Sequence, residues 1–126
     1  MISEFRVLDK MLKTDGFETS FDYKIEDVKY QDGIYVVLLY IPSGLKEVDN
    51  IYGVDSDGKI VWRIENPIQA FNIEKDVSWY EHMASSIYVM MNLSLSGVFT
   101  ATTFSAMKYT FDHRTGKLLD QEFMRW

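Results

Sequence analysis

The sequence predicts a mainly β fold: a single-domain antiparallel sheet, sandwich or open barrel built of β-hairpins. Apolar and polar residues alternate with a period of two along most of the chain, as in half-buried strands. Turns that contain Gly, Asp or Asn separate short β-branched and aromatic runs, which is typical of hairpins. The chain has 126 residues, of which 47% are hydrophobic and 25% charged. We therefore expect one domain with its own core over residues 1–126.

The N-terminal segment fits a short helix. Ser3 is a suitable N-cap, and Asp15-Gly16 would end the helix. Residues 4–7 also alternate in period two, so a strand is the alternative. One helical face would carry Phe5, Leu8, Met11 and Leu12.

The next segment predicts a strand, a turn and a second strand. Residues 21–26 alternate between apolar and charged side chains, which indicates a half-buried strand. Gln31-Asp32-Gly33 predicts a turn. The run Ile34–Ile41 is apolar at every position, so it should be a central strand with both faces covered.

The remaining chain predicts further hairpins, for a total of about eight strands. Asp55-Ser-Asp-Gly58 separates two short apolar runs and should form a hairpin turn with positive φ at Gly58. Residues 68–85 fit neither period and predict a loop with one short helical turn. After that loop, strands are expected over 86–95, 97–104, 106–112 and 117–123, with residues 98–104 as a second central strand.

A faint repeat relates two of these hairpins. Val54–Trp62 and Phe111–Leu119 both read as strand, Asp, short turn, Gly-Lys and strand. This pattern resembles the blades of quinoprotein-like propellers. Closing such a ring takes at least about four blades of about 40 to 50 residues, more than 126 residues supply. We interpret the repeat as two hairpins.

Charge and composition exclude several classes of partner. Lys and Arg number 13 against 19 Asp and Glu, which gives a net charge of −6. This charge argues against nucleic acid or an anionic membrane as the main partner. The absence of cysteine excludes disulfides and thiolate chemistry. With no signal-like N-terminus and no apolar run near the roughly 20 residues of a membrane span, a cytoplasmic protein is expected.

Catalytic and metal motifs are weak, so we expect no enzyme activity, cofactor or metal site. Of the two histidines, His113 falls in a predicted turn and should be a solvated surface residue. His82 follows aromatic residues and is expected to pack against them rather than act in catalysis. The segment Asp55–Gly58 looks like a calcium loop, but Gly53 and Ile64 stand where that loop needs Asp and Glu.

Carboxylates and aromatic residues supply the candidates for partner binding. Carboxylates recur at a spacing of two, which places both on one face of a strand or both in water at a turn. Together with the net charge they predict an acidic patch for a basic protein. The eight Phe, eight Tyr and three Trp exceed what one small core would bury, so some should anchor an interface. The candidate partner-binding residues are Glu47, Asp49, Asp55, Asp57, Glu74, Asp76, Trp79 and Tyr80.

Three stretches, residues 49–62, 99–104 and 112–126, together resemble small acidic bacterial immunity-type proteins. In such families a short acidic β-rich chain is encoded beside a secreted or contact-delivered toxin and neutralises its toxic domain. The resemblance covers residues 49–126 and carries over no site residue. It implies a non-catalytic inhibitor whose partner is a cognate toxin domain, for instance a basic nuclease.

Two other classes of function remain as alternatives. A small-ligand-binding β-barrel or sandwich would need an aromatic-lined cavity of roughly 300 Å³ or more. An enzyme would need His82 to work with a neighbouring carboxylate, either Glu81 or Asp76. The sequence leaves strand order, oligomeric state and the identity of any partner open.

Overall fold

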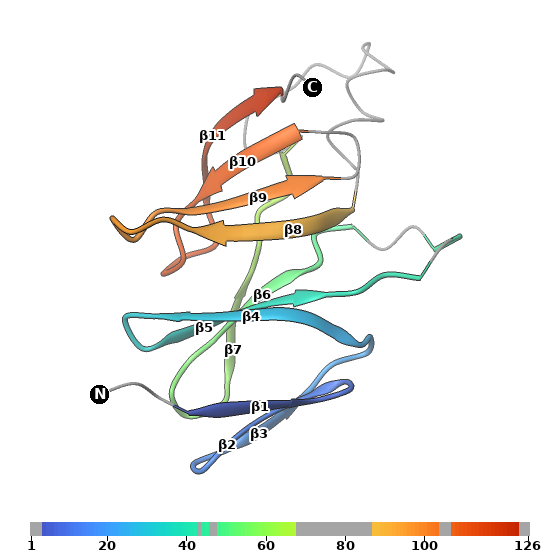
Figure 1. The fold of residues 1–126 in the computed structure, drawn as a ribbon, viewed down its shortest axis with the longest axis vertical. Coiled ribbons are helices and arrows are strands. Elements are labelled where there is room, and N and C mark those ends of the chain that lie inside the picture. The colour runs from blue at the N-terminus through green and yellow to red at the C-terminus, as the bar shows by residue number, and fades with distance from the viewer. Residues whose placement is uncertain (1–3, 43, 46–47, 68–86, 104–106, 124–126) are drawn as a thin grey trace.

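The computed structural model describes residues 4–42, 44–45, 48–67, 87–103 and 107–123. Its eleven elements are all β-strands, arranged in three antiparallel sheets. In Figure 1 the sheets lie one above another along the long axis, from the N-terminal sheet at the bottom to the C-terminal sheet at the top. The mainly antiparallel β fold built of hairpins is confirmed, with more strands than the eight expected.

Each sheet is a meander in which strands adjacent in the chain pair with each other. The first sheet contains β1 (Phe5–Leu8), β2 (Met11–Thr14) and β3 (Glu18–Ser20). The second contains β4 (Ile25–Gln31), β5 (Ile34–Leu39), β6 (Ile51–Val54) and β7 (Ile60–Arg63). The third contains β8 (Tyr88–Leu93), β9 (Phe99–Thr103), β10 (Met107–Phe111) and β11 (Leu118–Phe123). The three sheets form an open stack and no closed barrel among the residues described.

The predicted N-terminal helix is wrong, because this segment forms the hairpin of β1 and β2. Phe5 pairs with Thr14 and Leu8 with Met11, and β3 adds to the other edge of β2. Pairing in strands lets Leu12 point into the core, where it is fully buried, while Val7 stays exposed. The period-two alternation of residues 4–7 was therefore the better guide to this segment.

Both predicted central strands are confirmed, since β5 and β9 each have paired neighbours on both sides. The strand expected over residues 21–26 is displaced. Residues 21–24 form the connection from the first sheet to the second, and β4 starts at Ile25, which pairs with Leu39. The turn at residues 31–33 is confirmed, with positive φ at Asp32 and Gly33. The loop expected over residues 68–85 lies outside the described residues.

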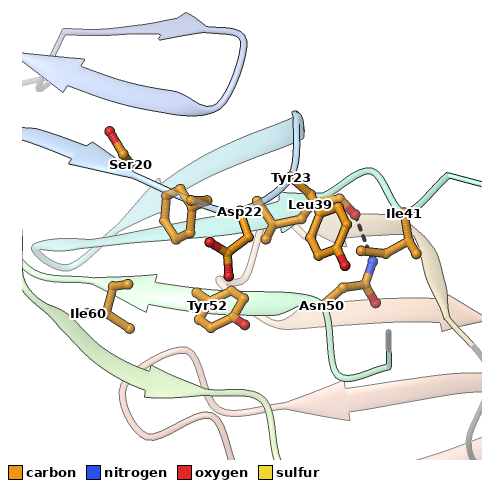
Figure 2. Close-up of a pocket in the computed structure, with 9 residues that line it drawn as sticks. Ser20, Asp22, Tyr23, Leu39, Ile41, Asn50, Tyr52 and Ile60 are labelled. Carbon is orange, nitrogen blue, oxygen red and sulfur yellow. Dashed lines mark hydrogen bonds between the residues drawn. The ribbon is translucent and has the colours of Figure 1, made fainter. Parts of the chain in front are cut away.

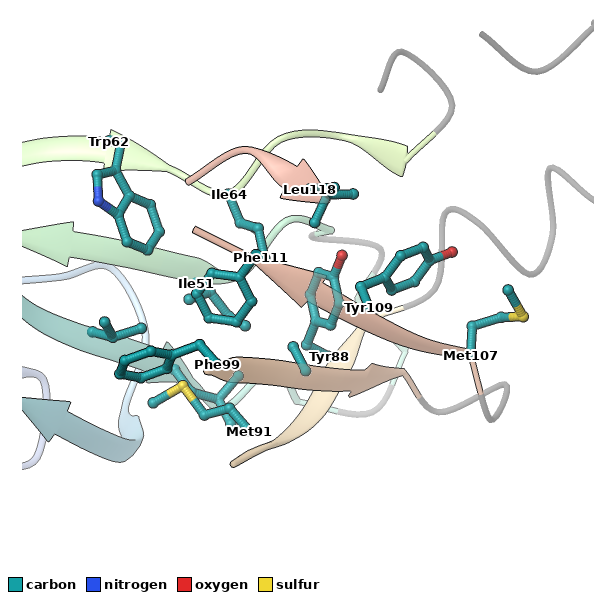
Figure 3. Packing of buried hydrophobic residues seen from close by; sticks show 13 residues of the cluster. Ile51, Trp62, Ile64, Tyr88, Met91, Phe99, Met107, Tyr109, Phe111 and Leu118 are labelled. Carbon is teal, nitrogen blue, oxygen red and sulfur yellow. The ribbon is translucent and has the colours of Figure 1, made fainter. Parts of the chain in front are cut away.

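The core consists of two apolar clusters, one on each face of the second sheet. Strand β5 contributes to both: Val36 and Leu38 point toward the third sheet, and Val37 and Leu39 toward the first. This double burial explains why β5 is apolar at every position. Figure 3 shows the cluster between the second and third sheets, whose members from the third sheet include Tyr88, Met91, Phe99, Tyr109, Phe111 and Leu118.

The two hairpins of the faint repeat occupy equivalent places in consecutive sheets. The β6–β7 turn docks on the first sheet, where the Thr19 hydroxyl donates to the Gly58 carbonyl at 2.6 Å. The β10–β11 turn docks on the second sheet, where Trp62 Nε1 donates to the His113 carbonyl at 2.8 Å. Gly58 and Gly116 both have positive φ. A Cβ on Gly58 would lie 2.7 Å from the Phe17 ring, and one on Gly116 2.6 Å from the Trp62 ring. Each turn thus packs its glycine against an aromatic ring of the preceding sheet.

Candidate functional site

A partly open pocket of about 250 Å³ lies between the β3–β4 connection and the second sheet (Figure 2). Its walls come from residues 20–23, residues 39–41 and residues 50–60. They combine three aromatic rings, three aliphatic side chains and one carboxylate. The lining residues are Ser20, Phe21, Asp22, Tyr23, Leu39, Ile41, Asn50, Tyr52 and Ile60.

The wall at residues 21–24 is held at both ends by backbone hydrogen bonds. The Phe21 amide donates to the Lys10 carbonyl at 2.8 Å, and the Ile25 amide donates to the Asp9 carbonyl at the same distance. On the other side, the Tyr40 amide donates to the Lys24 carbonyl at 2.7 Å. These bonds fix a short connection that contains no regular structure, so its side chains have a defined direction. In Figure 2 Asp22 and Tyr23 extend from this connection toward the second sheet.

Asn50 lines the pocket on the side that is nearest the third sheet, and its role there is structural. Its side chain is buried and donates from Nδ2 to the carbonyls of Leu39 at 2.8 Å and Tyr88 at 2.9 Å. Its Oδ1 accepts a hydrogen bond from the Tyr88 amide at 2.9 Å. The amide group thereby continues the backbone pairing from the second sheet to the third. Its hydrogen-bonding groups are engaged within the protein.

The charged and aromatic groups of the pocket remain accessible. Asp22 is exposed, and its carboxylate has no hydrogen-bond or ion-pair partner among the residues described. The Phe21 and Tyr52 rings contact each other, with centroids 5.6 Å apart. The Arg63 guanidinium lies 5.4 Å from the Tyr52 ring centroid and donates to the carbonyls of Asp49 and Val48 at 2.9 and 2.7 Å. The pocket can therefore offer the Asp22 carboxylate among aromatic and aliphatic side chains, with the Arg63 guanidinium lying on the Tyr52 ring.

Of the predicted acidic residues, the structure describes three, Asp49, Asp55 and Asp57, and these three do not lie together. Asp49 precedes β6, whereas Asp55 and Asp57 follow it, so they lie at opposite ends of that strand. The Asp49 carboxylate accepts hydrogen bonds from Asn66 Nδ2 at 3.2 and 3.4 Å. Asp55 Oδ1 accepts from the backbone amides of Asp57 and Lys59 at 2.9 and 3.0 Å, which stabilises the turn. Five candidates lie outside the described residues: Glu47, Glu74, Asp76, Trp79 and Tyr80.

The prediction for His113 as a solvated surface residue is wrong. Its side chain is buried, with Nε2 3.1 Å from Asp32 Oδ2 and its ring 5.2 Å from the Phe99 ring. The reason is that the β10–β11 turn packs against the second sheet rather than projecting into water. His82, the other histidine, lies outside the described residues.

Asp22 and Tyr23 were missed as site residues because their sequence pattern is that of an ordinary amphipathic strand. Nothing local indicates that residues 21–24 leave the sheet and face residues 50–60. No group of three or more His, Asp or Glu side chains among the described residues could hold a metal ion, and no helix there has the length and hydropathy of a membrane span.

Comparison with known proteins supports the fold and identifies the family. The chain is similar to the crystal structure of the computationally designed Ika8 protein, with a TM-score of 0.55 and 11% sequence identity. The match covers 96% of this chain but 36% of that one, and at this identity it concerns the fold alone. No curated protein matches the sequence. The family described as "Domain of unknown function (DUF7957)" matches residues 2–123, so the chain belongs to that family.

Proposed function

We propose that the protein is a non-catalytic binding protein whose partner is a basic protein. The observation that carries this proposal is the pocket in which the Asp22 carboxylate, which has no hydrogen-bond or ion-pair partner among the described residues, lies among aromatic rings. The chain carries a net charge of −6. Aromatic residues are enriched at protein interfaces, and a few such anchors supply most of the binding energy. The resemblance of residues 49–126 to immunity-type proteins supports a more specific form, in which the partner is a cognate toxin domain that the protein neutralises.

The electrostatic logic is that an acidic surface steers a basic partner toward the pocket. Asp22 and Asp57 are both exposed, and they lie on the β3–β4 connection and the β6–β7 turn. Charges of this kind raise the association rate more than they lower the dissociation rate. Screening by salt reduces that effect, because the Debye length is about 8 Å at physiological ionic strength.

The first experiment is co-expression with the product of the adjacent gene, followed by gel filtration and a growth assay. A stable complex and rescue from the toxicity of that product would support the toxin-neutralising role. A complex without any toxicity would support the binding function and exclude the toxin-neutralising role. If neither complex nor toxicity is found, the proposal fails for that partner class.

Where a complex forms, its association kinetics give a sharper test. The double variant Asp22→Asn/Asp57→Asn removes two exposed charges and should slow association severalfold at low salt, by weakening steering. It should also flatten the dependence of the association rate on salt. An association rate that is independent of salt in the unchanged protein would contradict the electrostatic mechanism.

Binding of a small molecule is the second candidate, and the same pocket favours it. The pocket volume of about 250 Å³ is slightly below the roughly 300 Å³ at which small-molecule sites begin, so the pocket suits a fragment-sized group better than a whole cofactor. Native mass spectrometry of the purified protein tests this candidate. A bound molecule of defined mass would favour it over the protein partner.

A further inference from the structure

We propose that the pocket receives a single arginine side chain of the basic partner. The guanidinium would lie against the Asp22 carboxylate, and the aliphatic stem would lie between the aromatic and aliphatic walls. This inference rests on the proposed function and adds the chemical group that the pocket recognises.

The charge in the pocket selects a cation. Asp22 is the charged residue of the lining, which contains no Lys, Arg or His. An anion would be repelled by this carboxylate and by the net charge of −6. A wholly apolar ligand would remove the carboxylate from water without giving it a partner, which is unfavourable. A cation replaces the lost hydration with a charge-assisted hydrogen bond.

The aromatic walls select a flat cation over a compact one. Phe21, Tyr23 and Tyr52 line the same pocket, and cations are attracted to the faces of such rings. A guanidinium can stack on a ring while two of its N–H groups face one carboxylate, whereas an ammonium is a strongly hydrated point charge. Arg63 already contacts the Tyr52 ring in this way, with its guanidinium 5.4 Å from the ring centroid, so Phe21 and Tyr23 are the rings that remain for a ligand cation.

The size and remaining surface of the pocket match one side chain. About 250 Å³ accommodates an arginine side chain and leaves room for water, but not a folded segment of a partner. Leu39, Ile41 and Ile60 offer apolar contact to the three methylene groups of the stem. Since the Asn50 side chain is neutral and hydrogen-bonds Leu39 and Tyr88, Asp22 is the group that decides the charge of the ligand.

The test is an NMR titration of the full chain with N-acetyl-arginine amide. We expect saturable shifts of amide signals from residues 20–23 and 50–52. Asp22→Asn should raise the dissociation constant about tenfold, the usual effect of losing a hydrogen bond between charged groups. Asp120→Asn is the matched control, because it removes the same charge from an exposed position of β11 in the third sheet, outside the pocket lining. Its dissociation constant should stay within about twofold of the unchanged protein, as expected for a screened distant charge.

Neutral and compact analogues give the outcomes that would overturn the inference. The citrulline derivative has nearly the same shape without the charge, and equal binding of it would exclude recognition of a cation. Equal or tighter binding of the lysine derivative would exclude arginine as the preferred group. Shifts that do not saturate, or an equal effect of Asp22→Asn and Asp120→Asn, would exclude the pocket as the site.

Failure of this inference can be distinguished from failure of the proposed function. If the basic partner dissociates from the Asp22→Asn variant as slowly as from the unchanged protein, the pocket is not the arginine site and the binding function stands. If no basic partner binds while N-acetyl-arginine amide does, the proposed function fails and the pocket's preference for arginine stands.

Discussion

Asn50 is a buried polar residue that joins the second sheet to the third. Its side chain makes three hydrogen bonds to backbone groups of Leu39 and Tyr88. Asn50→Ala would leave those backbone groups buried and unpaired. Each unpaired group costs about 1 to 3 kcal/mol of folding free energy. We expect the free energy of unfolding, measured by urea denaturation, to fall by about 3 kcal/mol or more. Asn92→Ala, at an exposed position of β8, is the control and should change it by less than about 0.5 kcal/mol.

Tyr88 predicts a loss of stability in alkaline solution. Burial raises the pKa of the Tyr88 phenol far above its ordinary value of 10.0, and negative charge on Tyr109 and Asp49 raises it further. The folded state therefore keeps a proton that the unfolded state releases. The stabilisation is fully present below pH 10 and is lost as the pH rises above it, by up to about 1.4 kcal/mol per pH unit.

Denaturation by urea at a series of pH values above 9 measures this slope. Tyr88→Phe keeps the ring that packs in the cluster of Figure 3 and removes the ionisable hydroxyl, so it should reduce the slope. Tyr40→Phe, at an exposed tyrosine, is the control and should leave the slope unchanged. Equal slopes in all three proteins would contradict the assignment to Tyr88.

At the scale of elements, Gly53 in β6 is required by the packing of β7. A Cβ on Gly53 would lie 2.1 Å from Trp62 Cε2, and Trp62 is buried with its Nε1 hydrogen-bonded to His113. Gly53→Ala should therefore lower the free energy of unfolding by about 3 kcal/mol through overpacking. Gly16→Ala is the control, because the nearest atom is Thr14 Oγ1 at 3.9 Å. A thermal melt in which both variants match the unchanged protein would contradict this role of Gly53.

The hairpins were predictable from sequence because their signals are local. Asp32-Gly33 and Gly58 take the positive φ values that their turn residues favour, and alternation marked the strands on either side. The N-terminal segment was mispredicted because residues 5–12 also place apolar side chains at helical spacing. Strand pairing with β3 decided between the two, and that pairing is not visible in a short window.

The candidate site was less predictable because it depends on how sheets are placed. The pocket unites Asp22 and Tyr23 with Tyr52, which lies about 30 residues later, and no local signal encodes that meeting. The sequence predicted Asp49 and Asp55 as partner-binding carboxylates. In the structure their oxygens accept hydrogen bonds from nearby backbone and side-chain amides. Acidic spacing alone therefore does not separate carboxylates that hold turns from those available to a partner.

At the scale of the whole molecule, the second sheet holds the stack together. It lies between the two apolar clusters, and β5 contributes side chains to both. The first sheet has three short strands, of four, four and three residues, and within the described part of the chain its apolar cluster is shared with the second sheet. Elements with fewer buried contacts open locally before the rest of a protein unfolds.

Native-state hydrogen exchange measures this hierarchy. Amides of β1, β2 and β3 should exchange through local openings whose free energy is at least about 2 kcal/mol below that of β5. Amides of β9, in the centre of the third sheet, should be protected to a similar degree as those of β5, since both strands are paired on two sides. Thr19→Val removes the hydrogen bond from the first sheet to Gly58 and should speed exchange in β1–β3 without changing β9. Equal protection of the first sheet and β5 would show that the stack opens as one cooperative unit.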